Sequence, residues 1–412
     1  MSANSPALFI KDDLIKYKAE MEEELQAILR YWIDFTVDNK NGGFVGRITH
    51  DNQVQEEAPK GSVLNSRILW SFSAAYNLTA NDAYLVMASR ACDYLMDRFI
   101  DKEWGGVYWT LDHKGQPLDT KKQIYGQAFA VYALSEYYKA TKNEAAKRAA
   151  IELYKSILLH SYDKTYGGYL EALSRNWQAT DDLRLSQKDA NEKKSMNTHL
   201  HVLEAFASLY RVWPGEGLKQ KIKELLSLFI NHILTKQKDH LLLFFEEDWT
   251  PKSTIISYGH DVEAAWLLQE AAETIGDGPL FAEVQACSVL IARGAAEGLD
   301  EDGGLWYEYD GAHQGLIRQK HWWPQAEAMV GFLNAWQLTG DQRWLERSLE
   351  SWAFVKTWIK DGTGEWKWGI NGDYSLMRNE DKAGIWKCPY HNSRACIEIV
   401  HRINSYNNGY EE

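Results

Sequence analysis

Histidine, arginine and carboxylate side chains recur at the openings of helix-like segments in this 412-residue chain. Capping of the first helical turn accounts for Asn65 and Asn197. Capping does not explain Arg67, His201 or the acidic residues at these openings. Histidine side chains there could instead transfer protons, because an imidazole exchanges protons near neutral pH. The openings read Asn65-Ser66-Arg67, Tyr125-Gly126-Gln127, Asn197-Thr198-His199-Leu200-His201, His260-Asp261-Val262-Glu263, Trp323-Pro324-Gln325-Ala326-Glu327 and His391-Asn392-Ser393-Arg394.

The spacing inside an opening indicates which side chains share a helix face. Asn197 and His201 are four apart and share a face, whereas His199 and His201 do not. We therefore predict that His201 faces inward and that His199 is a packing residue. Glu263 lies three positions after His260, where it could orient the imidazole or be a surface carboxylate. Arg67 could pair with Glu263 or Glu327. We interpret the histidines outside the openings as surface or core residues; these are His113, His160, His232, His240, His313, His321 and His401.

A metal site is an alternative use of the same side chains. His201, His260 and His391 with Glu263 would make a plausible ligand set. The sequence lacks a compact ligand motif such as His-Glu-x-x-His, and it also lacks a P-loop, a Rossmann glycine fingerprint and a nucleophile elbow. We therefore favour proton transfer by side chains over metal catalysis.

A recurring glycine motif indicates how these openings are brought together. Gly42, Gly105 and Gly167 are 63 and 62 positions apart, and each begins a Gly-Gly pair that leads into an aromatic or apolar run. Gly303 and the degraded copy at Gly364 are 61 apart, but Gly167 and Gly303 are separated by 136. That gap holds one missing copy, which we assign to Leu243-Phe244-Phe245-Glu246. Six units that fill one chain predict a closed ring.

Each unit contains two helical patterns, recognised by apolar spacings of three and four. The first kind is apolar on nearly all sides, as expected of helices buried by neighbours: Asn65–Tyr76, Tyr125–Tyr138, Met196–Tyr210, His260–Glu273, Trp323–Trp336 and His391–Ile403. The second kind is amphipathic and predicts an outer layer: Ile15–Phe35, Asp82–Phe99, Lys142–Leu159, Leu218–Ile233, Leu280–Gly298 and Gln342–Ile359. Alternating inner and outer helices predict an all-α fold, an (α/α)6 barrel with short strands at one end.

The composition, net charge and cysteine spacing of the chain argue against several classes of protein. The repeat runs from end to end without a linker, so we predict a single domain over residues 1–412. A net charge of −13 and a pI near 5.5 argue against nucleic acid or anionic membrane as a partner. Met1–Lys11 does not resemble a signal peptide, and no apolar run approaches a membrane span. Cys92, Cys287, Cys388 and Cys396 lack paired spacing, which favours reduced thiols and a cytoplasmic location. We expect a monomer.

Aromatic residues suggest the kind of ligand. The chain has 18 Trp and 22 Tyr residues, and most of them can be core filler. Some stand beside polar groups at the helix openings, as Trp323 does before Gln325 and Tyr125 before Gln127. Rings beside hydrogen-bonding groups suit sugars, whose C–H faces stack while their hydroxyl groups need polar partners. This pattern favours a carbohydrate ligand.

Five segments resemble the cellobiose 2-epimerases within the wider N-acylglucosamine 2-epimerase superfamily. They are Lys60–Trp70, Asn197–His201, Tyr258–Glu263, Trp322–Glu327 and Trp386–His391. The resemblance covers nearly the whole chain and implies an (α/α)6 barrel, a disaccharide substrate and no cofactor. It implies general acid/base roles for His260 and His391. It places pocket residues at Arg67, Tyr125, Asp189, Asn197, His201, Glu263, Trp323 and Trp386, and we add Glu327 to the expected substrate-binding set.

Inversion at C2 of a reducing sugar needs two proton-transfer groups. Ring opening frees an aldehyde, which acidifies the C2 hydrogen; one base removes that hydrogen, an enediolate forms, and a proton must then return to the opposite face. Histidines that titrate near neutrality suit this task. We expect His391 to deprotonate the glucose form and His260 to return a proton. Arg67 and His201 would stabilise the anionic oxygen.

The same interpretation assigns supporting roles. Glu263 would hold the tautomer of His260. Trp323 and Tyr125 would line the reacting sugar. Trp386 would stack on the second sugar, whose hydroxyl groups would bind Asp189 in the polar insertion Thr180–Ser195.

Three other functions remain open at the sequence level. An aldose–ketose isomerase, such as a mannose isomerase, would share the enediolate and return the proton elsewhere. A glycosidase would need two carboxylates, such as Asp189 with Glu327 or Glu263 with Glu327. A non-catalytic sugar-binding protein would use the tryptophans but would not need His260 and His391 together.

Overall fold

Inner and outer helices alternate along the chain, as the repeat predicts. The computed structural model describes residues 6–408. Residues 1–5, which belong to the segment examined for a signal peptide, and residues 409–412 lie outside the described part of the chain. The inner helices are α2 (Ser62–Thr79), α4 (Ile124–Thr141), α6 (Met196–Val212), α8 (Tyr258–Ile275), α10 (Trp322–Thr339) and α12 (Tyr390–Asn408). The outer helices are α1 (Pro6–Phe35), α3 (Asp82–Tyr94), α5 (Glu144–His160), α7 (Glu216–Leu228), α9 (Gly278–Ala295) and α11 (Gln342–Phe354).

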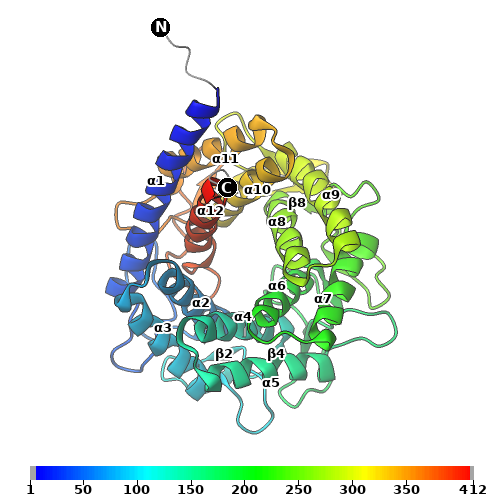
Figure 1. The fold of residues 1–412 in the computed structure, drawn as a ribbon. Coiled ribbons are helices and arrows are strands. Elements are labelled where there is room, and N and C mark those ends of the chain that lie inside the picture. Colours follow the sequence, from blue (N-terminus) through cyan, green and yellow to red (C-terminus); the bar gives the residue numbers. More distant parts are fainter. Residues whose placement is uncertain (1–5, 409–412) are drawn as a thin grey trace.

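The helices form two concentric rings, which makes the fold an (α/α)6 barrel (Figure 1). The inner helices are rich in Ala and Leu and are buried on most faces, because each packs between two inner neighbours and an outer helix. Helix α1 packs against α12, so the first outer helix meets the last inner helix and closes the ring. Among residues 6–408, none of the helices combines the length and the hydropathy that crossing a bilayer requires.

Three outer helices end in a wider turn that the sequence pattern treats as continuous helix. The π-helical turns are η1 (Leu95–Phe99), η2 (Phe229–Ile233) and η4 (Val355–Ile359), and α9 ends in the 3-10 turn η3 (Ala296–Gly298). Each turn leads directly into the hairpin at the same end of the barrel. In the first of them Leu95 and Phe99 are buried while the polar residues between them face outward.

The short strands join neighbouring repeats at the end of the barrel where the inner helices begin. All pairings are antiparallel, and they form the sheets β1-β2-β3, β4-β5, β6-β7, β10-β9-β8 and β11-β12. The strands are β1 (Lys60–Gly61), β2 (Thr110–Leu111), β3 (Pro117–Asp119), β4 (Lys122–Gln123), β5 (Ala172–Leu173), β6 (Lys194–Ser195), β7 (Phe244–Phe245), β8 (Ile255–Ser257), β9 (Glu308–Asp310), β10 (Gly315–Ile317), β11 (Gln319–His321) and β12 (Gly369–Asn371).

A buried lysine–aspartate pair ties most hairpins to the following strand. Lys194 Nζ lies 2.7 Å from Asp163 Oδ2. In this pair burial alone would raise the pKa of Asp163, but the lysine and two backbone N–H groups lower it overall. The same arrangement recurs in Lys60–Asp38, Lys122–Asp101, Lys320–Asp300 and Lys382–Asp361. Lys60 and Lys122, and likewise Lys320 and Lys382, are 62 positions apart, whereas the insertion before Lys194 widens that interval to 72. Each of these lysines fixes its hairpin at the rim.

The fourth repeat departs from this arrangement, as its missing glycines indicate. Phe244 and Phe245 form β7 in the predicted copy, but the turn that replaces the glycine pair comes earlier, between Leu234 and Leu241. Lys238 adopts the left-handed backbone (φ 59°) in that turn. Asp261 of α8 accepts hydrogen bonds from His240 Nδ1 (2.7 Å) and from the Leu241 N–H (2.8 Å).

One side chain in an inner helix binds the backbone of the hairpin behind it. His199 Nε2 accepts from the Tyr169 N–H at 2.9 Å, and its Nδ1 lies 2.6 Å from the Ser195 carbonyl oxygen. Gly168 makes this approach possible: its φ is +79°, and a Cβ there would lie 2.7 Å from His199 Nε2. Gln127, Asp261 and Gln325 bind hairpin N–H groups in the same way. The prediction that His199 is a packing residue is confirmed.

Replacing Ser195 with alanine should lower the free energy of unfolding by about 1 kcal/mol, because Ser195 is a helix N-cap. Its hydroxyl oxygen accepts from the Thr198 N–H at 3.1 Å at the start of α6. Urea denaturation followed by circular dichroism measures the change. Ser195→Asn, which can also cap the helix, should retain most of the stability. Equal midpoints for Ser195→Ala and the native protein would contradict the capping role.

Candidate active site

The first turns of the inner helices line a cavity of about 440 Å³ at the hairpin end of the barrel. Of the predicted site residues, Arg67, Tyr125, Asp189, Asn197, His201, His260, Glu263, Trp323, Trp386 and His391 line it. Glu327 is buried behind His391. The fold therefore brings residues from the six inner-helix segments and from the insertion that holds Asp189 to one place.

His391 is held by a buried carboxylate on the neighbouring inner helix. Its Nδ1 lies 2.6 Å from Glu327 Oε1 and 3.9 Å from Glu263 Oε1. Because a carboxylate is an acceptor, this contact places a hydrogen on Nδ1 and leaves Nε2 of the neutral ring as the basic nitrogen. The expected role of Glu327 in binding substrate is therefore corrected: its carboxylate contacts the imidazole of His391.

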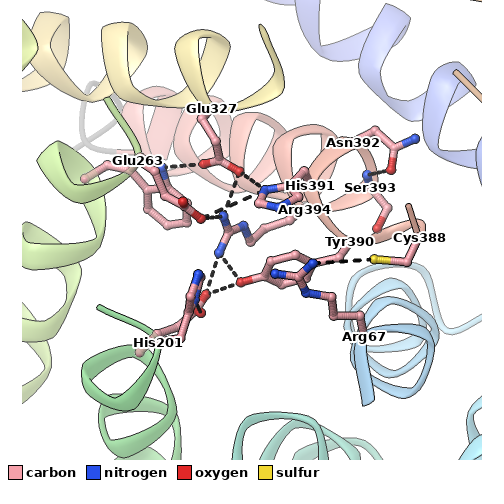
Figure 2. A network of polar contacts seen from close by, with 12 residues as sticks. Arg67, His201, Glu263, Glu327, Cys388, Tyr390, His391, Asn392, Ser393 and Arg394 are labelled. Atoms are coloured by element: carbon pink, nitrogen blue, oxygen red, sulfur yellow. Dashed lines mark hydrogen bonds and ion pairs between the residues drawn. The ribbon is translucent and has the colours of Figure 1, made fainter. Parts of the chain in front are cut away.

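Arg394 lies at the centre of the charged network below the cavity (Figure 2). Its Nη2 donates to Glu263 at 2.5 Å and to Glu327 at 2.7 Å, and its Nη1 donates to Glu204 at 2.5 Å and to the hydroxyl of Tyr390. The Arg394 side chain is 1% exposed. One guanidinium group therefore contacts carboxylates from three different helices.

The structure also corrects the expected contact between Glu263 and His260. The three-residue spacing does put both on one face of α8, but the Glu263 carboxylate turns toward Arg394, the nearest buried cation. The Nδ1 atom of His260 instead lies 2.8 Å from the hydroxyl oxygen of Ser257. His260 also packs against Trp323, with ring centroids 4.7 Å apart. Trp323 in turn lies 5.5 Å from the His391 ring, so one indole contacts both imidazoles.

His201 faces the cavity, as predicted, and is oriented by Glu204. Its Nδ1 lies 2.8 Å from Glu204 Oε2, one helical turn further along α6. Burial alone would raise the pKa of Glu204, but Arg394 and His201 lower it to about 2. Glu204 is therefore ionised at neutral pH and holds His201 with Nε2 directed away from it.

Burial shifts the other titratable groups toward their neutral forms. Desolvation, followed by the charge of Glu327, raises the pKa of Glu263 to about 7. Desolvation, followed by the charge of His201, lowers the pKa of His260 to about 3. Desolvation, assisted by Arg67 and Arg394, also lowers the pKa of His391. Burial thus favours the neutral form of both imidazoles. The expectation that they titrate near neutrality during turnover stays a prediction.

Arg67 pairs with neither of the two carboxylates considered from the sequence. Its Nη2 donates to the Tyr125 hydroxyl at 2.8 Å, and its Nη1 lies 3.9 Å from Cys388 Sγ. The guanidinium stacks over Phe129 and Tyr390, 4.2 and 4.7 Å from their ring centroids. Its buried Nε has no hydrogen-bond partner among the described residues. Arg67 thus lines the cavity and holds a buried donor without a protein partner among the described residues.

The insertion between β5 and β6 forms one wall of the cavity. Leu185 to Asp189 line it, and Asp189 Oδ2 accepts from the Ser186 N–H at 2.8 Å. Gln123 anchors the insertion by donating to the carbonyl oxygens of Leu183 (3.2 Å) and Arg184 (2.7 Å). Trp386 lies opposite, beside Tyr125. The wall therefore combines a carboxylate with aromatic faces.

Glu263, Glu327 and His391 also form the one metal-like grouping found among the described residues. Their ligand atoms lie within 4.8 Å of one another. Arg394 Nη2 already contacts both carboxylates, and a divalent cation there would stand beside this guanidinium charge. The grouping therefore fits a role in holding His391 better than a role in holding a metal.

Sequence reasoning missed several residues of the site. His321, interpreted as surface or core, lines the cavity together with Tyr307, and their rings stack at 4.0 Å. Their signal was weak because both lie on or beside strands, outside the helix openings. Arg394 and Glu204 lie on inner helices at spacings of three from His391 and His201, which could have identified them.

Fold and site together define an (α/α)6-barrel enzyme of the class that acts on carbohydrates, with histidines and tryptophans in a polar cavity. The model of the N-acylglucosamine 2-epimerase (GlcNAc 2-epimerase) family matches residues 20–395, and the chain belongs to this family. A cellobiose 2-epimerase of Bacteroides fragilis is 49% identical over 385 residues, which cover 93% of this chain and 98% of that protein.

Solved structures agree with this assignment. The structure of the cellobiose 2-epimerase from Bacillus thermoamylovorans has a TM-score of 0.90 and 38% identity, covering 94% of this chain and 99% of that one. A D-mannose isomerase structure has a TM-score of 0.80 at 22% identity, covering 93% and 97%, and shares the fold.

Proposed function

We propose that this protein catalyses reversible inversion at C2 of the reducing-end sugar in β-1,4-linked disaccharides. Cellobiose would give glucosyl-mannose, and lactose would give epilactose. The observation that carries the proposal is the placement of His260 and His391 against one indole, Trp323, in a single cavity. The cellobiose 2-epimerases among its relatives support the choice of substrate class.

The proposed reaction starts from the open-chain aldehyde. In the glucose form, Nε2 of His391 takes the C2 hydrogen, and the resulting imidazolium is stabilised by Glu327 at its Nδ1. After rotation about C2–C3, protonated His260 gives a proton from Nε2 to the opposite face of C2. The two rings exchange roles in the reverse direction. Trp323 and Tyr125 line the reacting sugar, and Trp386, Asp189 and Asn197 contact the substrate around it.

The enediolate oxygen needs hydrogen-bond donors that are in place before the charge develops. Arg67 and His201 are positioned for this role, because Arg67 has an unpartnered Nε and His201 is oriented by an ionised Glu204.

Arg67→Lys should lower kcat on the order of 10²-fold with a smaller change in KM, because the charge remains but the planar donor fork is lost. Initial rates of epimerisation at several cellobiose concentrations measure both constants, and circular dichroism checks the fold. A kcat within twofold of the native value would exclude Arg67 from oxyanion stabilisation.

Incubation of cellobiose with the enzyme in D2O tests the function. NMR should show a mannose-type product with deuterium at C2. An aldose–ketose isomerase would give a ketose, a glycosidase would release free glucose, and a binding protein would leave the sugar unchanged. The glycosidase alternative is also disfavoured by the site, because Glu263 and Glu327 both bind Arg394.

The remaining parts of the proposal concern the working form of the enzyme. We propose a monomer of one domain over residues 1–412 that acts in the cytoplasm without a metal or other cofactor. The four cysteines are buried free thiols, which supports a reducing compartment.

A further inference from the structure

Ser257 stands at a helix N-cap but does not cap the helix. It precedes α8, and its hydroxyl makes no hydrogen bond to the N–H groups of the first turn. Ser195, at the same position before α6, does cap its helix. Ser257 is fully buried, so its hydroxyl must find another partner. That partner is His260 Nδ1, at 2.8 Å.

The contact differs in kind from those of the other two cavity histidines. His391 and His201 direct Nδ1 at carboxylates, at 2.6 and 2.8 Å. A carboxylate orients the ring and also stabilises the imidazolium by its charge. A hydroxyl orients the ring without adding a charge. His260 is therefore oriented at Nδ1 like its counterparts, but without a counter-ion on its own hydrogen-bonded side.

We propose that Ser257 is a positioning residue for His260: its hydroxyl accepts the Nδ1 hydrogen, directs Nε2 to the sugar and leaves the imidazole without a fixed counter-charge. This proposal rests on the proposed epimerase function and assigns a role to a residue behind the reacting groups. Ser257 does not touch the substrate cavity, whereas His260 lines it.

The proton balance explains why a neutral partner suits this position. When His260 acts as the acid, Nε2 gives its proton to C2 of the enediolate and the Nδ1 hydrogen stays on the ring, directed at Ser257. When it acts as the base, Nε2 takes the C2 proton and the same Nδ1 hydrogen remains in place. The hydroxyl serves both steps without gaining or losing a proton. Because no carboxylate binds Nδ1, the protonated ring is a strong donor to the enediolate.

The charged surroundings of His260 decide what a new charge at position 257 would do. After desolvation, the charge of His201 lowers the pKa of His260 and so disfavours its protonated form. The other titratable or charged groups around it line the same cavity and include Arg67, Lys188, Asp189, Glu263, Tyr307, His321, Glu380 and His391. Arg67 is cationic, and the carboxylate of Glu263 is already bound by Arg394. A carboxylate at position 257 would thus be the one anion hydrogen-bonded to this ring.

Three substitutions of Ser257 test the proposal. Ser257→Ala should lower kcat by roughly tenfold with KM changed less than threefold, because the orientation of the ring is lost while the sugar contacts remain. Ser257→Thr keeps the hydroxyl and should recover most of kcat. Ser257→Asp should move the pH profile of kcat/KM to higher pH, because its carboxylate raises the proton affinity of His260. The pH shift reports that position 257 contacts the ring of His260, and the tautomer of His260 separates a positioning role from a merely structural one.

Ser195→Ala is the matched control, since it removes the corresponding hydroxyl from a helix cap and should lower stability while leaving kcat unchanged. Nitrogen-15 NMR of histidine-labelled protein gives a readout that does not depend on turnover. His260 should be an Nδ1–H tautomer in the native protein and a tautomer mixture in Ser257→Ala. Native kcat in Ser257→Ala, an unmoved pH profile in Ser257→Asp or an unchanged tautomer would each overturn the proposal. A native enzyme that fails to deuterate C2 would instead overturn the proposed function.

Discussion

His391→Asn should strongly slow formation of the C2 epimer while leaving hydrogen exchange at one of the two sugars. The asparagine cannot act as a base, so the C2 hydrogen of cellobiose should stay in place. His260 remains able to remove the C2 hydrogen of glucosyl-mannose and to return deuterium to the same face. The turnover number for epimerisation should fall by about 10²–10⁴-fold, the usual contribution of one general acid or base.

His260→Asn should give the opposite pattern, with the two sugars exchanging their behaviour. Cellobiose should exchange its C2 hydrogen with D2O without becoming glucosyl-mannose, and glucosyl-mannose should not exchange. NMR integration of the C2 signals over time measures both. His401→Asn is the control, because His401 lies on the same helix as His391 but is exposed outside the cavity. If either active-site variant epimerised at a near-native rate, the scheme with two histidines would be wrong.

Arg394→Ala should lower the free energy of unfolding by about 3–5 kcal/mol, the range found when one partner of a buried ion pair is removed. It leaves Glu204, Glu263 and Glu327 buried without their shared cation. Activity should fall as well, because Glu327 and Glu204 would no longer hold His391 and His201 in place. Urea denaturation measures the stability, and Arg343→Ala, which removes a largely exposed ion pair, should change it by less than about 1 kcal/mol.

The effect of Arg394→Ala should depend on pH in a defined direction. Arg394 is the main group that lowers the pKa of Glu204 to about 2, below its value in the unfolded chain. Its stabilising contribution is therefore fully present above the unfolded pKa of about 4.3 and is lost as the pH falls toward 2. The difference between native protein and variant should be largest at neutral pH and should shrink in acid. A difference that did not change with pH would show that Arg394 stabilises the fold by packing alone.

The architecture could be predicted because it repeats. Helical spacing and the glycine period are local properties, and together they located every inner helix to within a few residues. The fourth hairpin was harder, since its turn uses Lys238 in a left-handed conformation and a His240–Asp261 contact in place of glycines. The wide π-helical turns at the ends of outer helices also leave no clear trace in apolar spacing.

The residues that line the cavity were easier to predict than the hydrogen bonds and ion pairs that they form. Position in the helix openings identified eight of the 19 lining residues, including His260 and His391, and the family resemblance added Asp189 and Trp386. It could not tell which partner each would reach across the barrel, so Glu263 was assigned to His260 and Glu327 to the sugar. These choices are settled by Arg394, a long side chain that spans four inner helices. Sequence spacing describes one helix at a time and does not predict contacts between side chains on different helices.

Helix α12 carries His391, Tyr390 and Arg394, and it is also the element that seals the ring against α1. Of the helices in residues 6–408, α12 is synthesised last. Before it is added, the acidic groups on α6, α8 and α10 lack their shared cation, and the proposed proton-transfer pair lacks His391. Under the proposed mechanism, the helix that closes the ring is therefore also the helix that completes the site.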